Sequence, residues 1–332
     1  MVNPIVAMIR RPQQQRRRRR LLHIEGEHAV HEERFHGIGG IEQWVTVRGQ
    51  DRANPVVVIV HGGPGSPYTP FNSWITGWEQ EFTVVQWDQR GGGKTFVRAG
   101  NTAPGLSLER LVEDGVELVE HLVSHFGQKV LLVGSSVGSL TASIMVRRRP
   151  GLFRGFVAAN VLAPDPDDER YSQILRWAQD SGRKRTVRAL ERIGSDHRRW
   201  SSADSLAFSK LALAASDDVP DMVYDLMLPA LMYDPTLTMR DIRAFDRAMS
   251  LSLRVLQPEY EDYDFASLGF DYEVPVTFVQ GAGDRISPVG LARKYFDAIR
   301  APRKQFVTVT GAGHLVEFAD PGRFLSTLRT SH

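Results

Sequence analysis

The feature that most constrains the fold is an apolar strand that runs directly into a Gly-x-Ser-x-Gly turn. Residues 131–133 are Leu-Leu-Val, and Gly134, Ser136 and Gly138 fill the three fixed positions of the turn. Small residues on both sides of the serine let a strand and a following helix approach each other closely. Residues 140–149 then carry apolar side chains at helical spacing and end before a proline. This arrangement is typical of a nucleophile elbow, which holds a serine Oγ clear of the backbone.

A second strand, upstream of the elbow, ends in a glycine-rich turn. Residues 56–60 read Val-Val-Val-Ile-Val, which favours a fully buried parallel strand, and residues 61–65 read His-Gly-Gly-Pro-Gly. A turn of this kind at a strand end can direct a backbone N–H at a developing oxyanion. We therefore expect the N–H groups of Gly63 and Val137 to form an oxyanion hole. The Asp-Gln-Arg loop at 88–90 follows another apolar strand, and we expect it to brace its surroundings by hydrogen bonds.

Two later strands end in loops that carry an acid and a histidine. The apolar segment 274–280 is followed by Asp284, and the segment 305–309 is followed by His314. A nucleophilic serine needs a histidine base and an acid that orients it, and each of these follows a strand in such a fold. We therefore predict Ser136, Asp284 and His314 as a catalytic triad. The sequence holds no cysteine, which excludes a thiol nucleophile and a thiolate metal site.

The order of these motifs resembles that of the α/β-hydrolases, and more narrowly that of the proline iminopeptidase group of serine peptidases. The resemblance covers roughly residues 40–163 and 265–332. It implies an α/β-hydrolase fold, with a mostly parallel, doubly wound sheet and an inserted helical cap. The group usually has tryptophan where this chain has Val137 and glycine where it has Ser135, so the substrate stays open. The matching elements are His61 to Gly65, Asp88 to Gly91, Gly134 to Ser139, Asp284 and His314.

The rest of the chain divides by its composition. Residues 21–163 and 265–332 alternate strands and helices, and form the expected core. Residues 164–264 begin in a proline- and aspartate-rich turn and continue with helical patterns, as expected of a cap. Residues 1–20 hold seven arginines and no acid, and we expect a disordered arm there. An arm of this kind also suits a tether to nucleic acid or to an anionic surface.

Within the core, residues 107–126 form the strongest helical pattern. Apolar side chains recur along them at helical spacing and build one continuous stripe. Ser107 is suited to cap the start of the helix, and Gly127 is suited to end it. A strand at 129–133 follows directly, which is the alternation that a parallel, doubly wound sheet requires.

These patterns predict a serine hydrolase that works through an acyl-enzyme, and the resemblance implies a proline iminopeptidase-like aminopeptidase that acts on small peptides or amides. A carboxylesterase, a lactonase and a carbon–carbon bond hydrolase would use the same triad, and a catalytically silent receptor would share the fold. An aminopeptidase needs a carboxylate for the substrate's ammonium group. The cap offers four candidates for that role: Glu169, Asp221, Asp225 and Asp234.

The expected partner is a small molecule or a short peptide, with no nucleic acid and no membrane. We expect no metal and no organic cofactor, because the triad chemistry needs neither. The apolar segment 5–9 is too short for a secretory signal and precedes the arginines instead of following them. We therefore expect a cytoplasmic protein.

Overall fold

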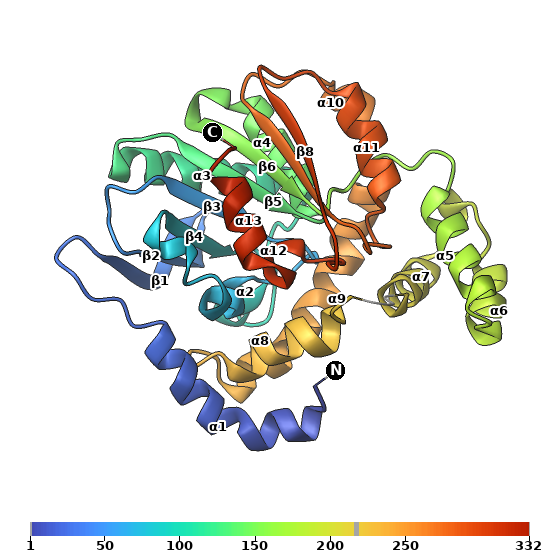
Figure 1. The fold of residues 1–332 in the computed structure, drawn as a ribbon, viewed down its shortest axis with the longest axis horizontal. Helices are drawn as coiled ribbons and strands as arrows, with labels where there is room; N and C mark the ends of the chain where they lie inside the picture. The colour runs from blue at the N-terminus through green and yellow to red at the C-terminus, as the bar shows by residue number, and fades with distance from the viewer. Residues whose placement is uncertain (1, 216–218, 332) are drawn as a thin grey trace.

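The computed structural model describes residues 2–215 and 219–331, and in this part of the chain eight strands form a single sheet (Figure 1). The strands lie in the order β1-β2-β4-β3-β5-β6-β7-β8. The β1–β2 and β2–β4 pairs are antiparallel, and all later pairs are parallel. The strands are β1 (Val30–Ile38), β2 (Ile41–Gly49), β3 (Val56–Val60), β4 (Thr83–Asp88), β5 (Val130–Ser135), β6 (Phe153–Ala159), β7 (Val276–Gly281) and β8 (Lys304–Val309).

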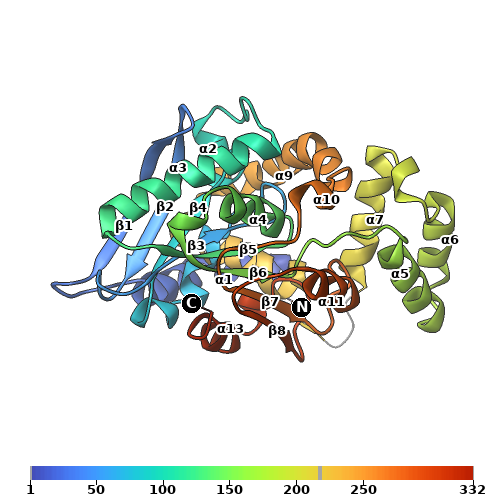
Figure 2. The same ribbon diagram turned by 90° about the horizontal axis from the view of Figure 1, so that it is seen from above.

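Helices cover both faces of this sheet, and β3 shows how the two apolar layers arise. Val56 and Val58 belong to the cluster that contains α3, α4 and α11, whereas Val57 and Ile59 belong to the cluster that contains α12 and α13. Figure 2 shows α3 and α4 on one side of the sheet and α13 on the other. Successive side chains of a strand point to opposite faces, so a strand buried on both sides must be apolar throughout. The core helices are α2 (Gly93–Arg98), α3 (Leu108–Phe126), α4 (Gly138–Arg148), α11 (Val289–Ala298), α12 (Val316–Ala319) and α13 (Pro321–Leu328).

Helix α3 begins and ends as its sequence predicts. The Ser107 side chain accepts a hydrogen bond from the Arg110 N–H, and Gly127 ends the helix in a left-handed conformation with φ 66°. Glycine adopts this conformation without the steric cost that a Cβ would bring. The apolar stripe of the helix packs on the sheet and thereby places β5 and its turn.

The segment between β6 and β7 is helical, as expected, and it divides into two parts. Helices α5, α6 and α7 have an apolar core of their own and stand beside the sheet (Figure 2). Helices α8 and α9 instead share the main core, through Ala230 on one face of the sheet and Leu256 and Tyr260 on the other. The helices of this segment are α5 (Glu169–Asp180), α6 (Lys184–Ile193), α7 (Ser202–Ala214), the π-helical η5 (Met222–Met227), α8 (Leu228–Tyr233), α9 (Met239–Glu261) and α10 (Phe265–Leu268).

The arginine-rich arm differs from the expectation of disorder, because it forms helix α1 (Pro4–Leu21). The Asn3 side chain caps its first turn and Pro4 occupies its first position. One face of the helix is anchored to the α8 region: the Arg11 guanidinium donates to the Leu237 carbonyl at 2.6 Å, and the Gln15 amide donates to the Asp234 carbonyl at 2.7 Å. Composition could not predict these contacts, because they join residues more than 200 positions apart in the sequence.

Candidate active site

The predicted nucleophile lies in the tight turn between β5 and α4. Ser136 has φ 55°, a left-handed conformation that is costly for any residue with a Cβ. Two hydrogen bonds hold it there: the Ser136 N–H donates to the Ala159 carbonyl at 2.9 Å, and the Ser139 N–H donates to the Ser136 carbonyl at 2.9 Å. The residue is nine-tenths buried, with 9% of its surface exposed. A strained and nearly enclosed serine at a strand end is the geometry that a nucleophile elbow requires.

The loop after β3 approaches the elbow so closely that two positions require glycine. A Cβ added at Gly62 would lie 2.7 Å from the Ser136 Cβ. A Cβ added at Gly138 would lie 2.5 Å from the His61 carbonyl oxygen. Both distances are below van der Waals contact, so any side chain at these positions would push the β3 loop away from the elbow.

The predicted acid and base meet at the carboxyl ends of β7 and β8. His314 Nδ1 lies 2.9 Å from Asp284 Oδ2, and the other carboxylate oxygen accepts the N–H groups of Ile286 and Ser287, both at 2.9 Å. Both side chains are buried. With Nδ1 donating to the carboxylate, the lone pair of the neutral imidazole lies on Nε2, where a base needs it.

The charge of Asp284 controls the titration of this histidine. Burial of the ring lowers the pKa of His314, but the charge and the hydrogen bond of Asp284 outweigh burial, so the pKa lies above its usual value. Glu317 acts in the same direction. The carboxylate therefore fixes the tautomer and also stabilises the imidazolium that forms when the base takes a proton.

The glycine-rich turn after β3 reaches the elbow and is held by a buried histidine. His61 Nδ1 lies 2.9 Å from the Gly62 carbonyl oxygen, and its Nε2 accepts the Gln89 N–H at 3.1 Å. Across residues 2–215 and 219–331, the N–H groups of Gly63 and Val137 have no hydrogen-bond acceptor. Both predicted oxyanion donors are therefore free to bind a ligand oxygen.

The Asp-Gln-Arg loop braces the same region, as expected. Asp88 accepts hydrogen bonds from the Thr69 hydroxyl at 2.7 Å and from the Lys94 N–H at 2.8 Å. Burial raises the pKa of Asp88 to about 6. Arg90 forms a buried ion pair with Asp114, with Nε 2.9 Å from Oδ2. These contacts fix the loop that supports His61.

One buried carboxylate near the triad was not found by reasoning from the sequence. Glu317 accepts hydrogen bonds from the Ser135 hydroxyl at 2.6 Å and from the Asn160 amide at 2.9 Å, and Tyr68 donates to the same Ser135 oxygen at 3.1 Å. Burial raises the pKa of Glu317. The residue thus joins the elbow strand, the end of β6 and the helix that follows His314. The only sign of this role in the sequence was that the glutamate follows His314 by three positions.

The four cap acids have structural partners. Glu169 forms an ion pair with Lys294 at 2.5 Å, and Asp234 accepts the Thr236 N–H at 2.6 Å. Asp221 caps η5 by accepting the N–H groups of residues 223 and 224, and Asp225 accepts the Asp221 N–H at 3.1 Å. Among the contacts of the described residues, none joins these acids to Ser136 or His314.

The helical segment does reach the triad at Val219. A Cβ added at Gly283 would lie 2.7 Å from a Val219 methyl group, and one added at Gly313 would lie 3.0 Å from the other. Val219 therefore packs on both loops that carry the acid and the base. Asp221 follows Val219 by two residues in the chain.

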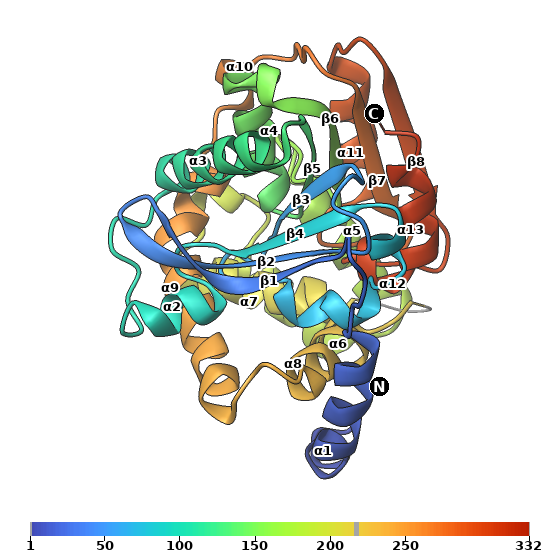
Figure 3. The same cartoon turned by 90° about the vertical axis from the view of Figure 1, so that its left-hand side faces the viewer.

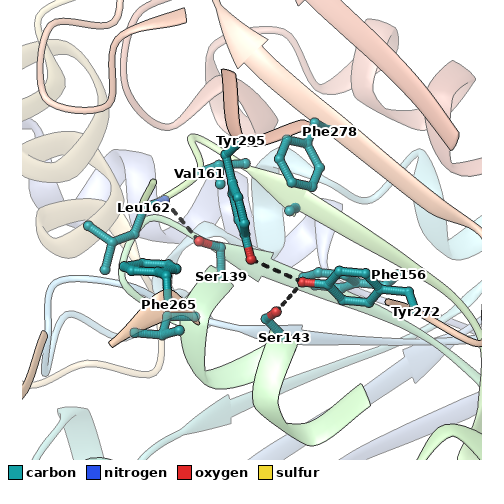
Figure 4. Close-up of a pocket in the computed structure, with 11 residues that line it drawn as sticks. Ser139, Ser143, Phe156, Val161, Leu162, Phe265, Tyr272, Phe278 and Tyr295 are labelled. Atoms are coloured by element: carbon teal, nitrogen blue, oxygen red, sulfur yellow. Dashed lines mark hydrogen bonds between the residues drawn. The ribbon is translucent and has the colours of Figure 1, made fainter. Parts of the chain in front are cut away.

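A small void behind the nucleophile helix is a packing feature and no substrate site (Figure 4). Tyr272 contacts Ser143 and shares a hydrogen bond of 3.3 Å with Tyr295, while Ser139 accepts the Leu162 N–H at 3.0 Å. The void measures about 10 Å³, room for a single water molecule. In the part of the chain that the structure describes, no group of three or more His, Asp or Glu side chains could hold a metal ion.

The fold and the site geometry agree with the comparison to known families. The family described as alpha/beta hydrolase fold matches residues 55–321, so the chain belongs to it. The "Probable aminopeptidase YbaC" of Bacillus subtilis (strain 168) is 25% identical over 298 residues, which are 88% of this chain and 93% of that protein.

Two solved structures show the same fold. A proline iminopeptidase-related protein from Thermus thermophilus has a TM-score of 0.59 at 17% identity, covering 91% of this chain and 96% of its own. A thermophilic esterase from Thermogutta terrifontis has a TM-score of 0.59 at 19% identity, covering 91% and 97%. The chain is therefore an α/β-hydrolase with a resemblance to iminopeptidases.

Proposed function

We propose that this protein is a serine hydrolase that works through an acyl-enzyme. The observation that carries the proposal is the strained elbow conformation of Ser136 in a fold whose Asp284–His314 pair is already hydrogen-bonded. Ser136 attacks a carbonyl carbon, and His314 takes the serine proton and later gives it to the leaving group. Asp284 keeps the proton of the neutral His314 ring on Nδ1, so that Nε2 can act as the base. Water then hydrolyses the ester on Ser136 by the same proton transfers in reverse.

The N–H groups of Gly63 and Val137 stabilise the oxyanion of each tetrahedral intermediate in this proposal. Their support is that both are unpaired and that they lie on the two segments that meet at Gly62 and Ser136. Removal of one donor of this kind typically raises the barrier by about 3–4 kcal/mol. A hydrogen bond from the Gln89 N–H to His61 Nε2 holds the start of the glycine turn in place. A donor held in place before the reaction costs no reorganisation during it.

For the substrate we favour small peptides or amides with a free N-terminus, cleaved by an aminopeptidase. The support is the name of the Bacillus subtilis relative, a probable aminopeptidase, and the iminopeptidase-related structural neighbour. Residues 164–264 would form the cap over the site, and Asp221 is our candidate for binding the substrate's ammonium group. The support is that Asp221 lies two residues from Val219, which packs on the loops of Asp284 and His314, and that only its Oδ1 is used in capping η5.

A carboxylesterase is the second candidate, and one observation favours it. Glu169, Asp225 and Asp234 are occupied by structural contacts, so the cap offers few carboxylates to an ammonium group. The esterase among the structural neighbours has the same fold. A lactonase or a carbon–carbon bond hydrolase would need the same triad, and a silent receptor would need none of it.

The test is hydrolysis of a prolyl arylamide and of a short-chain aryl ester by the wild type, Ser136→Ala and Ser139→Ala. Ser139 is the matched control, because it lies three residues further along, in the first turn of α4, and its hydroxyl accepts the Leu162 N–H. We expect arylamide turnover that Ser136→Ala abolishes and Ser139→Ala leaves within about tenfold. Ester turnover alone would replace the aminopeptidase with the esterase. Turnover that survives Ser136→Ala would overturn the mechanism.

A further inference from the structure

Helix α1 carries a solvent-facing surface that the hydrolase mechanism does not use. Its inner stripe, Ala7, Arg11, Gln15 and Arg18, packs on the α8 region, where Arg18 also lies over the Trp74 and Tyr233 rings. Helical periodicity places Ile5, Ile9, Arg16 and Arg20 on the opposite stripe. The helix lies on the outer side of α8 and projects beyond the sheet (Figure 1 and Figure 3).

This outer stripe is apolar in its first turns and basic in its last turns. Ile5 is 71% exposed and Ile9 is 74% exposed, and Met8 beside them is half exposed. Among the described residues, eight large apolar side chains are exposed, and seven of them lie in α1 or in η5: Ile5, Val6, Met8, Ile9, Leu21, Val223 and Tyr224. A hydrogen bond from the Val2 N–H to the Tyr224 carbonyl joins the two elements. Most of the exposed large apolar side chains of the described residues therefore lie on these two neighbouring elements.

The charge of helix α1 is one-sided. Of the seven arginines of α1, five are exposed and have no carboxylate partner in the part of the chain that is described: Arg10, Arg16, Arg17, Arg19 and Arg20. The helix contains no acidic residue, whereas the rest of the chain holds 34 basic and 39 acidic side chains. The exposed arginines of α1 thus stand in contrast to the mildly acidic remainder of the chain.

We propose that α1 and η5 form a peripheral docking surface for an anionic lipid bilayer. A bilayer surface satisfies both halves of the outer stripe at once, because its headgroups attract arginine and its acyl boundary takes up isoleucine. A nucleic acid would satisfy the arginines and leave the isoleucines in water. No helix in the described residues is long and apolar enough to cross a membrane, so the helix would lie in the surface plane. The sequence led us to expect no membrane partner, and this proposal replaces that expectation.

The docking surface is also connected to the site. η5 begins three residues after Val219, which packs on the loops of Asp284 and His314. A bilayer bound at η5 therefore lies beside the segment that reaches the triad. Docking itself needs no catalysis, so Ser136→Ala is expected to bind vesicles like the wild type.

The test is co-sedimentation of the full chain with vesicles of phosphatidylcholine, with and without about 30% phosphatidylglycerol. We expect binding to the anionic vesicles only, and its loss at high salt. Each arginine near such a surface contributes about fivefold to partitioning, so the double variant Arg16→Gln/Arg20→Gln should bind about 30-fold more weakly. The matched control is Arg188→Gln/Arg192→Gln, a pair with the same spacing that is exposed on α6 and should bind normally.

The apolar half is tested by Ile5→Ser/Ile9→Ser, with Leu206→Ser on α7 as the exposed apolar control. We expect at least tenfold weaker binding for the first and no change for the second. All variants alter exposed side chains, so unchanged circular dichroism verifies their fold. Equal sedimentation of wild type and both double variants would overturn the proposal. It would also be overturned if the surface instead bound an oligonucleotide independently of Ile5 and Ile9, or if these isoleucines served to form a dimer in solution.

Discussion

The buried His61 makes the stability of this protein depend on pH in a way that one substitution can isolate. The ring is 2% exposed, and burial lowers the pKa of His61 from 6.5 to about 4, against a smaller opposite effect of the Gly62 carbonyl. Its Nε2 accepts the Gln89 N–H, so the folded protein needs the neutral ring. The unfolded chain takes up the proton near pH 6.5, well before the folded chain does.

The direction and size of the effect follow from this difference. Above about pH 6.5 both states hold the neutral ring and His61 adds no pH dependence. As the pH falls, only the unfolded state gains the proton, so the free energy of unfolding decreases. One pKa unit corresponds to about 1.4 kcal/mol, which makes the loss about 2 kcal/mol at about pH 5 and about 3 kcal/mol at about pH 4.

The assay is urea unfolding of the wild type, His61→Gln and His28→Gln across this range of pH. A glutamine oxygen can accept the Gln89 N–H and does not titrate. His61→Gln should therefore be less stable than the wild type near neutral pH. The difference in unfolding free energy between the two proteins should shift by about 3 kcal/mol in favour of the variant at about pH 4. Carboxyls such as Asp88 titrate alike in both proteins and cancel in the difference. His28 is exposed, so its variant should follow the wild type. A constant difference between His61→Gln and the wild type at every pH would refute the reasoning.

Three further predictions concern the triad and its support. Asp284→Asn should lower kcat by about 10³- to 10⁴-fold. It should also move the acid limb of the kcat/KM profile to lower pH, because the Asp284 carboxylate raises the pKa of His314. An acid limb that stays at the same pH would count against this role. Glu317→Leu leaves the Ser135 hydroxyl and the Asn160 amide without their acceptor. It should therefore lower the free energy of unfolding by about 2–4 kcal/mol in urea titrations. A loss below about 1 kcal/mol would mean that these hydrogen bonds contribute little to stability. Arg90→Met removes one of the two arginines that pair with the buried Asp114 carboxylate, Arg110 being the other, and leaves the Pro104 and Gly39 carbonyl oxygens without their donor. It should cost about 2–4 kcal/mol by the same measurement, while Arg98→Met, at an exposed pair, should cost under about 1 kcal/mol. Similar losses for the two variants would contradict the burial argument.

The sequence predicted those parts of the fold that local chemistry determines. The β-branched run at 56–60 is a strand buried on both faces, and α3 begins at its serine cap and ends at its glycine. The elbow was predictable because a serine between small residues, after a strand and before a helix, leaves few other conformations. The loops of Asp284 and His314 were predictable because parallel strands bring their carboxyl ends to one edge of the sheet.

The sequence did not predict features that depend on contacts between distant residues. Helix α1 was expected to be disordered, since its charge gave no sign of the carbonyl groups near α8 that anchor Arg11 and Gln15. Glu317 went unnoticed because its partners, Ser135 and Asn160, come from other strand ends. The four cap acids were predicted as ammonium ligands from the composition of residues 164–264. Composition does not show that these acids already accept hydrogen bonds from the backbone or pair with a lysine.

The central claim is that Ser136 carries the acyl group, and intact-protein mass spectrometry with a fluorophosphonate tests it most directly. Activated serines attack this reagent whatever their natural substrate, so the test does not depend on the substrate class. We predict one added group per chain, mapped to Ser136, its absence in Ser136→Ala, and labelling at least about 10³-fold slower in His314→Ala. A wild type that stays unlabelled, or a label on Ser135 or Ser139 instead, would contradict the account.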